Sequence, residues 1–154
     1  AQLRLSEARL YDLKVSLICL DVDHFKKVND EHGHKAGDRV LVAVGQALTE
    51  VAGERLIAGR LGGEEFALLM LGEANEARGW AEAARAKIKE RAGVTASAGV
   101  ATGTELDDLL RRADAALYRA KRTGRDRLVS DVPLPVPAVP MGRHTPRTAV
   151  PEGG

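Results

Sequence analysis

The apolar residues of this chain form two kinds of pattern, continuous runs of strand length and runs with helical spacing. Continuous runs of about four to eight apolar residues indicate strands. The predicted strands are Val15 to Leu20, Leu56 to Leu61, Phe66 to Leu71, Val94 to Ala101 and Arg127 to Val129. The first run is apolar on both faces, so we expect it at the centre of a sheet.

Apolar residues three or four positions apart predict helices between these strands. The predicted helices are Gln2 to Lys14, a short segment with Phe25 to Asn29 that breaks at His32-Gly33-His34, Ala36 to Val51, Ala74 to Glu90 and Leu106 to Ala120. We expect Thr104 and Asp107 to cap the start of the last helix and Gly124 to stop it.

The order strand, helices, two-strand hairpin, helix, strand is that of the split βαβ, or ferredoxin-like, arrangement. We therefore predict an α+β domain over residues 15–130, with an antiparallel sheet flanked by helices. Residues 1–14 are predicted to form an N-terminal helix, the end of a linker or a truncated first helix. All six prolines lie between Pro133 and Pro151, so residues 131–154 are expected to form a disordered tail.

Composition and charge narrow the classes of function. A formal net charge of +1 with 29% charged residues gives no basic excess of the kind that general nucleic-acid or membrane-surface binders carry. No apolar stretch approaches the ~20 residues that span a bilayer, and the start has no signal-peptide pattern. The single cysteine, Cys19, lies in an apolar run, as expected for a small core residue in a reducing compartment. Together these features predict a cytoplasmic protein.

Gly62-Gly63-Glu64-Glu65 separates the two hairpin strands, and packing alone does not explain two adjacent carboxylates there. Glycines allow positive φ and let a ligand approach main-chain N–H groups, so such a turn can hold phosphate. Two acids would repel that anion unless a divalent cation lay between them, which points to a phosphate-bound Mg²⁺. The alternative is a solvated hairpin with two surface glutamates, and these four residues alone do not decide between the two.

Asp21 provides a second part of the possible metal site. In the predicted topology, the first strand and the first hairpin strand are parallel, with the second hairpin strand between them. Asp21-Val22-Asp23, at the end of the first strand, therefore shares a sheet edge with the turn that carries Glu64. Adjacent strands are about 5 Å apart, so the two carboxylates can ligate one cation. Alone, the Asp-x-Asp pattern is more often an ordinary exit from a strand into a turn.

Four separated blocks together resemble the GGDEF family of diguanylate cyclases, in its GGEEF variant, over about Val15 to Val129. The blocks are Asp21 to Asp30, Gly33-His34 with Gly37-Asp38, Arg60 to Phe66, and Ala113 to Lys121 with Gly124-Arg125. The resemblance implies a palm-type sheet like that of other nucleotidyl cyclases. It also implies a transferase in cyclic di-GMP signalling, which condenses two GTP molecules into cyclic di-GMP and releases two pyrophosphates.

The resemblance further implies a metal site and catalytic residues. Asp21, the carbonyl of Val22 and Glu64 would hold Mg²⁺, two ions per site, with Mn²⁺ as a substitute, and these hard cations prefer oxygen ligands. Glu64 would also help to deprotonate the 3′-hydroxyl that attacks the α-phosphate. Glu65 stands at the second acidic position of the motif and is grouped with Glu64 as a candidate catalytic residue.

Contacts to the nucleotide follow from the same resemblance. Asn29 and Asp38 resemble the pair that reads guanine, and helix-end caps are the alternative role for both. The candidates for holding the triphosphate are the backbone N–H groups of Val22 to Phe25, His24 and Phe25 among them, and the side chains of Lys26, Lys121 and Arg125. The last two also lie in an arginine-rich run, which is usually a solvated helix face.

Two features depart from the family pattern. Many members carry an inhibitory Arg-x-x-Asp site ahead of the turn, and here Gly53 and Leu56 stand at those positions. The inhibitory site is therefore predicted to be absent, unless Glu54 and Arg55 replace it from an altered register. A segment that usually precedes the first helix is not in this chain, so we expect either that the chain is a piece of something longer or that the segment has been lost. An N-terminal sensor or dimerisation segment is also expected to be missing.

One site holds one GTP, whereas the product joins two, so the resemblance implies a homodimer with a GTP half-site on each subunit. No nucleic-acid or membrane partner is predicted for this chain. A second hypothesis, from a different class, is a catalytically silent GTP-binding module with a regulatory or interaction role.

Overall fold

Residues 13–131 are described by the structure, which is a computed structural model. The helix predicted over residues 1–14 and the tail predicted over residues 131–154 lie almost wholly outside this range. Within it, the elements are β1 (Val15–Val22), α2 (Phe25–His32), α3 (His34–Ala52), β2 (Ile57–Gly62), β3 (Glu65–Leu71), α4 (Ala74–Ala92), β4 (Ala96–Gly103), α5 (Leu106–Arg122) and β5 (Leu128–Ser130). None of the described helices is long and apolar enough to cross a membrane.

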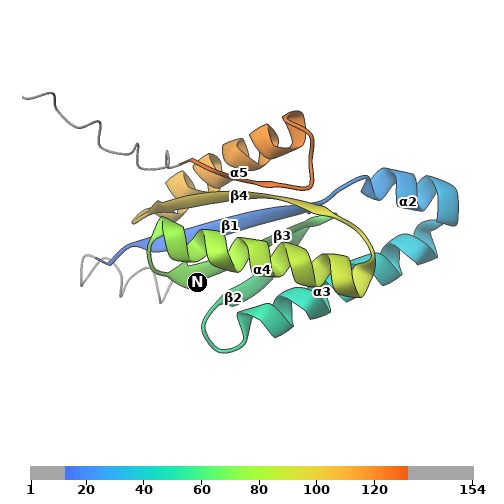
Figure 1. Cartoon of the computed structure of the whole chain (residues 1–154), viewed down its shortest axis with the longest axis horizontal. Coiled ribbons are helices and arrows are strands. Elements are labelled where there is room, and N and C mark those ends of the chain that lie inside the picture. Colours follow the sequence, from blue (N-terminus) through green and yellow to red (C-terminus); the bar gives the residue numbers. More distant parts are fainter. Residues whose placement is uncertain (1–12, 132–154) are drawn as a thin grey trace, which may run out of the picture.

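A five-stranded sheet in the order β2-β3-β1-β4-β5 forms the centre of the molecule (Figure 1). β1 is antiparallel to both β3 and β4, and β2 and β3 form an antiparallel hairpin, whereas β5 is parallel to β4. β1 and β2 therefore run in the same direction with β3 between them. The predicted split βαβ arrangement and the α+β class are confirmed.

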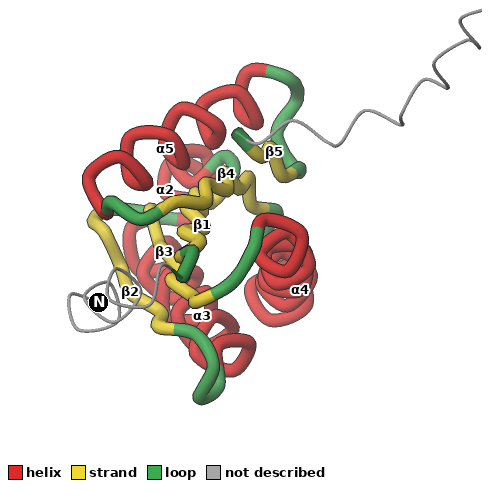
Figure 2. The backbone as a smooth tube through the Cα atoms, turned by 90° about the vertical axis from the view of Figure 1, so that its left-hand side faces the viewer, coloured by secondary structure: helices red, strands yellow, loops and turns green. Residues whose placement is uncertain are grey.

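Helices cover both faces of the sheet. Figure 2 shows α5 on one side, and α3 and α4 on the other. Side chains on α3 and α4 share one apolar cluster with one face of the sheet, and α5 shares a second cluster with the opposite face. The short helix α2 continues from the end of β1 and contains no buried residue, which leaves it free to border a site rather than a core.

β1 is buried along its whole length, as its apolar run predicts. Because alternate residues of a strand face opposite sides, Ile18 and Leu20 join the cluster with α3 and α4, while Leu17 and Cys19 join the cluster with α5. The same alternation turns Asp21 to the α5 face. A carboxylate is thereby placed where the apolar run ends, under the end of α5.

Gly99 allows α5 to pack directly on β4. A Cβ at this position would overlap the backbone carbonyl oxygen of Ala113 and the backbone nitrogen of Leu117. Backbone atoms cannot rotate away as side chains can, so only glycine permits this close approach. This contact holds α5, and with it Lys121, at a fixed height above the sheet.

Several boundaries differ from the predictions, and one predicted cap is wrong. The hairpin strands extend to Gly62 and Glu65, so the turn is tighter than the four residues expected. β4 begins at Ala96, two residues later than predicted, because Gly93 ends α4 in a left-handed conformation and the chain must still cross to the sheet. Thr104 and Asp107 do not form the expected capping pair: Glu105 is the N-cap of α5, and no side chain bonds there.

Candidate functional site

The end of β1 meets the hairpin turn between β2 and β3. Asp21 stands opposite Glu65 in the β1–β3 register, and the backbone N–H of Val22 donates to the carbonyl oxygen of Glu64 at 3.2 Å. Both glutamates are half-buried, unlike the exposed side chains of a solvated hairpin. The structure therefore brings Asp21 and Glu64 to one sheet edge, as the topology predicted.

An open cavity of about 570 Å³ lies at this edge. Its lining includes eight of the residues singled out in the sequence: Asp21, Val22, His24, Phe25, Lys26, Glu64, Lys121 and Arg125. They come from the end of β1, the start of α2, the hairpin turn, the end of α5 and the turn after it. Segments far apart in the chain thus converge on one acidic and basic hollow, which we call the main cavity.

Asp21 is a buried acidic residue of the main cavity, and its pKa is shifted by its surroundings. It is 5% exposed, and Lys121 Nζ donates to its Oδ2 at 2.6 Å. Burial raises the pKa of Asp21 above its ordinary value; Lys121 opposes this shift, and the nearby charges of Glu64 and Glu65 add to it. A further cation that reaches this site would stabilise the charged form of Asp21, because it would offset burial and the charges of the two neighbouring acids.

The residues at this edge fit a hard divalent cation. The described part of the chain has no cluster of three or more His, Cys, Asp or Glu side chains that could hold a metal. Asp21 and Glu64 nevertheless offer two carboxylates to the same cavity, and Val22, which follows Asp21 at the end of β1, lines it as a source of a carbonyl oxygen. Oxygen donors of this kind suit Mg²⁺ or Mn²⁺, which binds through one or two carboxylates together with substrate phosphates.

The start of α2 provides backbone donors for an anion. His24 adopts a left-handed φ of 55°, and no side chain caps the helix. The N–H groups in the first turn of a helix have no carbonyl partner within the helix and attract negative charge. The prediction for Val22 and Asp23 is wrong, because their N–H groups already donate to the carbonyls of Glu64 and Thr95. The available donors begin at His24 and Phe25.

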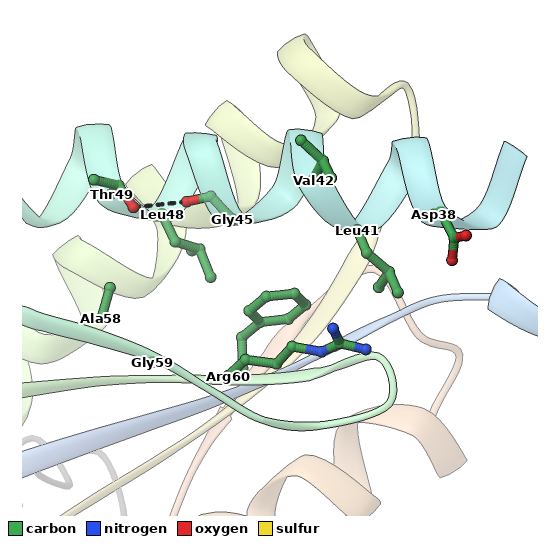
Figure 3. A pocket seen from close by; sticks show the side chains of 10 residues that line it. Asp38, Leu41, Val42, Gly45, Leu48, Thr49, Ala58, Gly59 and Arg60 are labelled. Carbon is green, nitrogen blue, oxygen red and sulfur yellow. Dashed lines mark hydrogen bonds between the residues drawn. The ribbon is translucent and has the colours of Figure 1, made fainter. Parts of the chain in front are cut away.

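The two predicted guanine contacts lie outside the main cavity. Asp38 lines a second cavity of about 530 Å³ between α3 and the hairpin, together with Leu41, Arg60 and Phe66. Figure 3 shows Asp38 and Leu41 on α3 facing the hairpin strand that carries Arg60. Arg60 Nε donates to the carbonyl of Gly63 at 2.9 Å and so ties this second cavity to the turn.

Asn29 lies on the other side of the α2–α3 junction. Its Oδ1 packs against Gly37, where a Cβ would overlap it, and Phe25 lies beside the same glycine. Neither Asn29 nor Asp38 caps a helix: Gly33 occupies both cap positions at this junction and no side chain bonds there. The helix-cap alternative therefore does not hold for Asn29 or Asp38.

Glu65 is separated from Glu64. Its side chain lines a smaller cavity of about 250 Å³ on the α5 face, beside Cys19 and Asp114. Burial raises the pKa of the Cys19 thiol to about 12, with further contributions from Asp114 and Glu65, so this cysteine is a core residue as predicted. Of the two acids in the motif, only Glu64 faces the main cavity.

Leu56 and Gly53 occupy the positions of the expected inhibitory motif. Leu56 is 5% exposed and belongs to the apolar cluster under α3 and α4, while Gly53 ends α3 with a positive φ. Neither can present the charged groups of an Arg-x-x-Asp site.

No role was predicted for the side chains of Asp23 and Arg85. Asp23 is 4% exposed and accepts hydrogen bonds from Ser97 Oγ at 2.6 Å, Thr95 Oγ1 at 2.7 Å and the N–H of Asp126 at 3.0 Å. These partners lie more than 70 residues away in the chain. Only the repeated acid in Asp21-Val22-Asp23 hinted at this second buried carboxylate.

The chain was compared with known proteins. The family model described as "Diguanylate cyclase, GGDEF domain" matches residues 1–127. The chain belongs to the GGDEF domain family. Its curated relatives include diguanylate cyclase VdcA of Vibrio cholerae, 40% identical over 131 residues, and diguanylate cyclase DgcP of Pseudomonas aeruginosa, 43% identical over 124 residues. These matches cover 75% and 73% of this chain.

Solved GGDEF structures resemble the whole described fold. The GGDEF domain of DgcB from Caulobacter crescentus, in complex with c-di-GMP, has a TM-score of 0.78 and 34% identity, and the match covers 83% of this chain and 84% of that one. The active GGEEF domain of a diguanylate cyclase from Vibrio cholerae has a TM-score of 0.75 and 31% identity, with 84% and 90% covered. By contrast, this GGDEF domain spans only 39% of VdcA and 18% of DgcP.

Proposed function

We propose that this GGDEF domain condenses two GTP molecules into cyclic di-GMP and two pyrophosphates. The observation that carries the proposal is the convergence of Asp21, Glu64, Lys121 and the start of α2 on the main cavity. Two carboxylates for a cation lie there beside basic groups and helix N–H donors for phosphate. Phosphoryl transfer depends on this combination, because its catalysis is mostly positioning and neutralisation of charge.

Glu64 receives the proton in the proposed reaction. The 3′-oxygen of one GTP forms a bond with the α-phosphorus of the other, and the bond from that phosphorus to the bridging oxygen breaks, so pyrophosphate leaves. The hydroxyl proton passes to the Glu64 carboxylate. A second identical step closes the ring. Mg²⁺ held by Asp21, the carbonyl of Val22 and Glu64 would neutralise the phosphate oxygens and lower the barrier.

The triphosphate would lie between the start of α2 and the end of α5. His24 and Phe25, at the start of α2, line this region together with Lys26, Lys121 and Arg125. Because Lys121 donates a hydrogen bond to Asp21, its ammonium group lies at the place where metal and phosphate would meet. Charged donors of this kind form stronger hydrogen bonds to phosphate than neutral donors do.

Guanine would be read between α3 and the hairpin. Asp38 can accept from the ring N–H and the exocyclic amino group, and the Asn29 amide can donate to the guanine carbonyl. Leu41 and Phe66 give the second cavity apolar walls that suit a flat base. Glu65 would then act indirectly, since its side chain lines the smaller cavity beside Cys19 and Asp114 instead of the main cavity.

Two copies of the domain would be needed for each product molecule, because each copy supplies one GTP half-site. The similarity to DgcB, a GGDEF domain solved with c-di-GMP, supports the product assignment.

The direct test uses purified protein, GTP and Mg²⁺, with the product identified by chromatography and mass. Cyclic di-GMP should accumulate, and Glu64→Ala should lower its rate by at least about 100-fold, as expected when a catalytic acid–base group is removed. GTP that binds but stays unchanged at high protein concentration would contradict the proposal and favour a silent GTP-binding module.

A further inference from the structure

The turn after α5 holds two consecutive non-glycine residues in left-handed conformations. The φ angles are 59° at Arg125 and 44° at Asp126. Residues other than glycine are strained in this region and stay there only where the surroundings hold them. The Arg125 side chain lines the main cavity, and within the described residues it forms no hydrogen bond or ion pair. The strained turn thus carries the Arg125 guanidinium, which has no partner among the described residues, into the main cavity.

Asp23 holds the turn from the end of β1. Its Oδ2 accepts the N–H of Asp126 at 3.0 Å and Thr95 Oγ1 at 2.7 Å, while its Oδ1 accepts Ser97 Oγ at 2.6 Å. Thr95 and Ser97 flank the start of β4. The buried carboxylate therefore fastens the turn to two strands of the sheet.

Arg85 holds the same turn from α4. Its Nε donates to the carbonyl of Ala96 at 2.9 Å, and a second guanidinium nitrogen reaches Asp126 Oδ1 at 2.6 Å. The Arg85 side chain is 13% exposed, so its position is fixed by packing. Asp126 is therefore held by two hydrogen bonds. Its backbone N–H donates to Asp23, and its carboxylate accepts from Arg85.

We infer that Asp23, Arg85 and Asp126 form a brace that positions Arg125 to bind the phosphates of the nucleotide. All three are positioning residues, and the inference deepens the proposed function, on which it rests. Without the brace, the strained turn would relax and the Arg125 guanidinium would sample many positions. A charged group that is already in place binds more tightly, because less motion is lost on binding.

The test measures binding, so it does not depend on turnover. The probe is the α,β-methylene analogue of GTP with Mg²⁺, which cannot release pyrophosphate, and its Kd is measured by calorimetry. Asp23→Ala and Arg125→Gln should each weaken binding about tenfold, the size of one lost charge-assisted hydrogen bond. The double variant should be no weaker than Arg125→Gln alone, because the brace acts only through Arg125.

A second variant keeps the fold intact and has a matched control. Asp126→Asn keeps a residue that tolerates left-handed backbone, but removes the charge that pairs with Arg85. It should weaken binding about threefold, as for a partly exposed ion pair, and only when Arg125 is present. Glu82 is an equally exposed partner of the same arginine, at 54%, but it does not touch the turn. Glu82→Gln should leave the Kd unchanged.

The inference is overturned if Asp23→Ala and Asp126→Asn bind the analogue as well as the unchanged protein. The inference is also overturned if the brace variants lose the same affinity for the analogue with Arg125 present as with Arg125→Gln. Equal losses would show a general effect on the structure. If Asp23→Ala does not fold, the Asp126→Asn cycle decides the matter alone. A further outcome is that the analogue binds tightly, with brace variants that weaken binding only when Arg125 is present, while no cyclic di-GMP is produced. That result would support the brace and contradict only the proposed reaction.

Discussion

Asp21 illustrates how a single residue can serve a site at a cost to the fold. It ends a strand that is otherwise apolar, and it is buried beside two other acids with one lysine bonded to it. Burial disfavours its charged form, which is why its pKa is raised. Carboxylates with shifted pKa values gather at functional sites.

We predict that Asp21→Asn makes the ligand-free protein more stable at neutral pH. The folded-state pKa of Asp21 lies above its ordinary value of 3.8, so at neutral pH the folded protein must bear a charge that its surroundings oppose. The stability gained by Asp21→Asn should shrink as the pH falls through the folded-state pKa of Asp21 and then through its unfolded-state pKa. Below both pKa values, Asp21 is protonated in the folded and in the unfolded protein. Urea unfolding at several pH values measures the difference.

Asp107→Asn is the control for this experiment. Asp107 is an exposed carboxylate on α5, and its replacement should change stability by less than about 0.5 kcal/mol. A clear loss of stability in Asp21→Asn at neutral pH would show that the Lys121 pair outweighs burial.

Gly37 has no side chain and so leaves room for the Asn29 amide, which is proposed to contact guanine. A Cβ there would overlap Asn29 Oδ1 and lie 3.2 Å from Phe25 Cζ. We predict that Gly37→Ala displaces the Asn29 amide and raises the KM for GTP about tenfold with little change in kcat, as for one lost hydrogen bond to the substrate. Asn29→Ala should raise the KM to the same value as Gly37→Ala does. The variant with both changes should have no higher KM than either single variant. Additive effects would separate Gly37 from the base contact.

At the scale of elements, α5 couples the fold to the site. It lies on β4 at Gly99 and ends with Lys121 bonded to Asp21. We predict that Gly99→Ala lowers the free energy of unfolding by about 2 kcal/mol or more, because a Cβ would press against the backbone of α5. Lys121 should also be displaced, so phosphate binding should weaken together with stability.

Gly79→Ala is the matched control for this change. Gly79 lies within α4, is exposed, and a Cβ there would meet no atom within 4 Å. Alanine is the better helix former, so stability should rise by about 0.5 to 1 kcal/mol. Denaturant unfolding of both variants gives the comparison, and a Gly99→Ala protein as stable as Gly79→Ala would contradict the packing account.

The elements also show how far sequence patterns reach. The apolar run of β1 predicted a central strand, and the element order predicted that Asp21 and Glu64 share a sheet edge. The four-residue hairpin turn and the Thr104–Asp107 cap were wrong, because bulges and caps depend on a few local angles. The brace could not be predicted, since Asp23 meets Asp126 across 103 positions of the chain and no local pattern records that contact.

At the scale of the whole molecule, the fold gathers chemistry at one edge of the sheet. The C-terminal end of β1, the hairpin turn and the end of α5 meet there, with α2 beside them (Figure 1). Leu56, at a position of the inhibitory motif, instead faces the core. The proposed site would hold one nucleotide, whereas the proposed product contains two, so the molecule would supply half of a catalytic centre.

The measurement that tests this account most directly is the rate of cyclic di-GMP formation from GTP and Mg²⁺ over a wide range of protein concentrations. If two half-sites must meet, the rate per protein molecule should rise in proportion to protein concentration while the protein is mostly monomeric, and should level off once dimers dominate. Glu64→Ala should lower the rate by at least about 100-fold at every concentration. A rate per molecule that is independent of concentration in a monomeric protein, or no product at any concentration, would contradict the account.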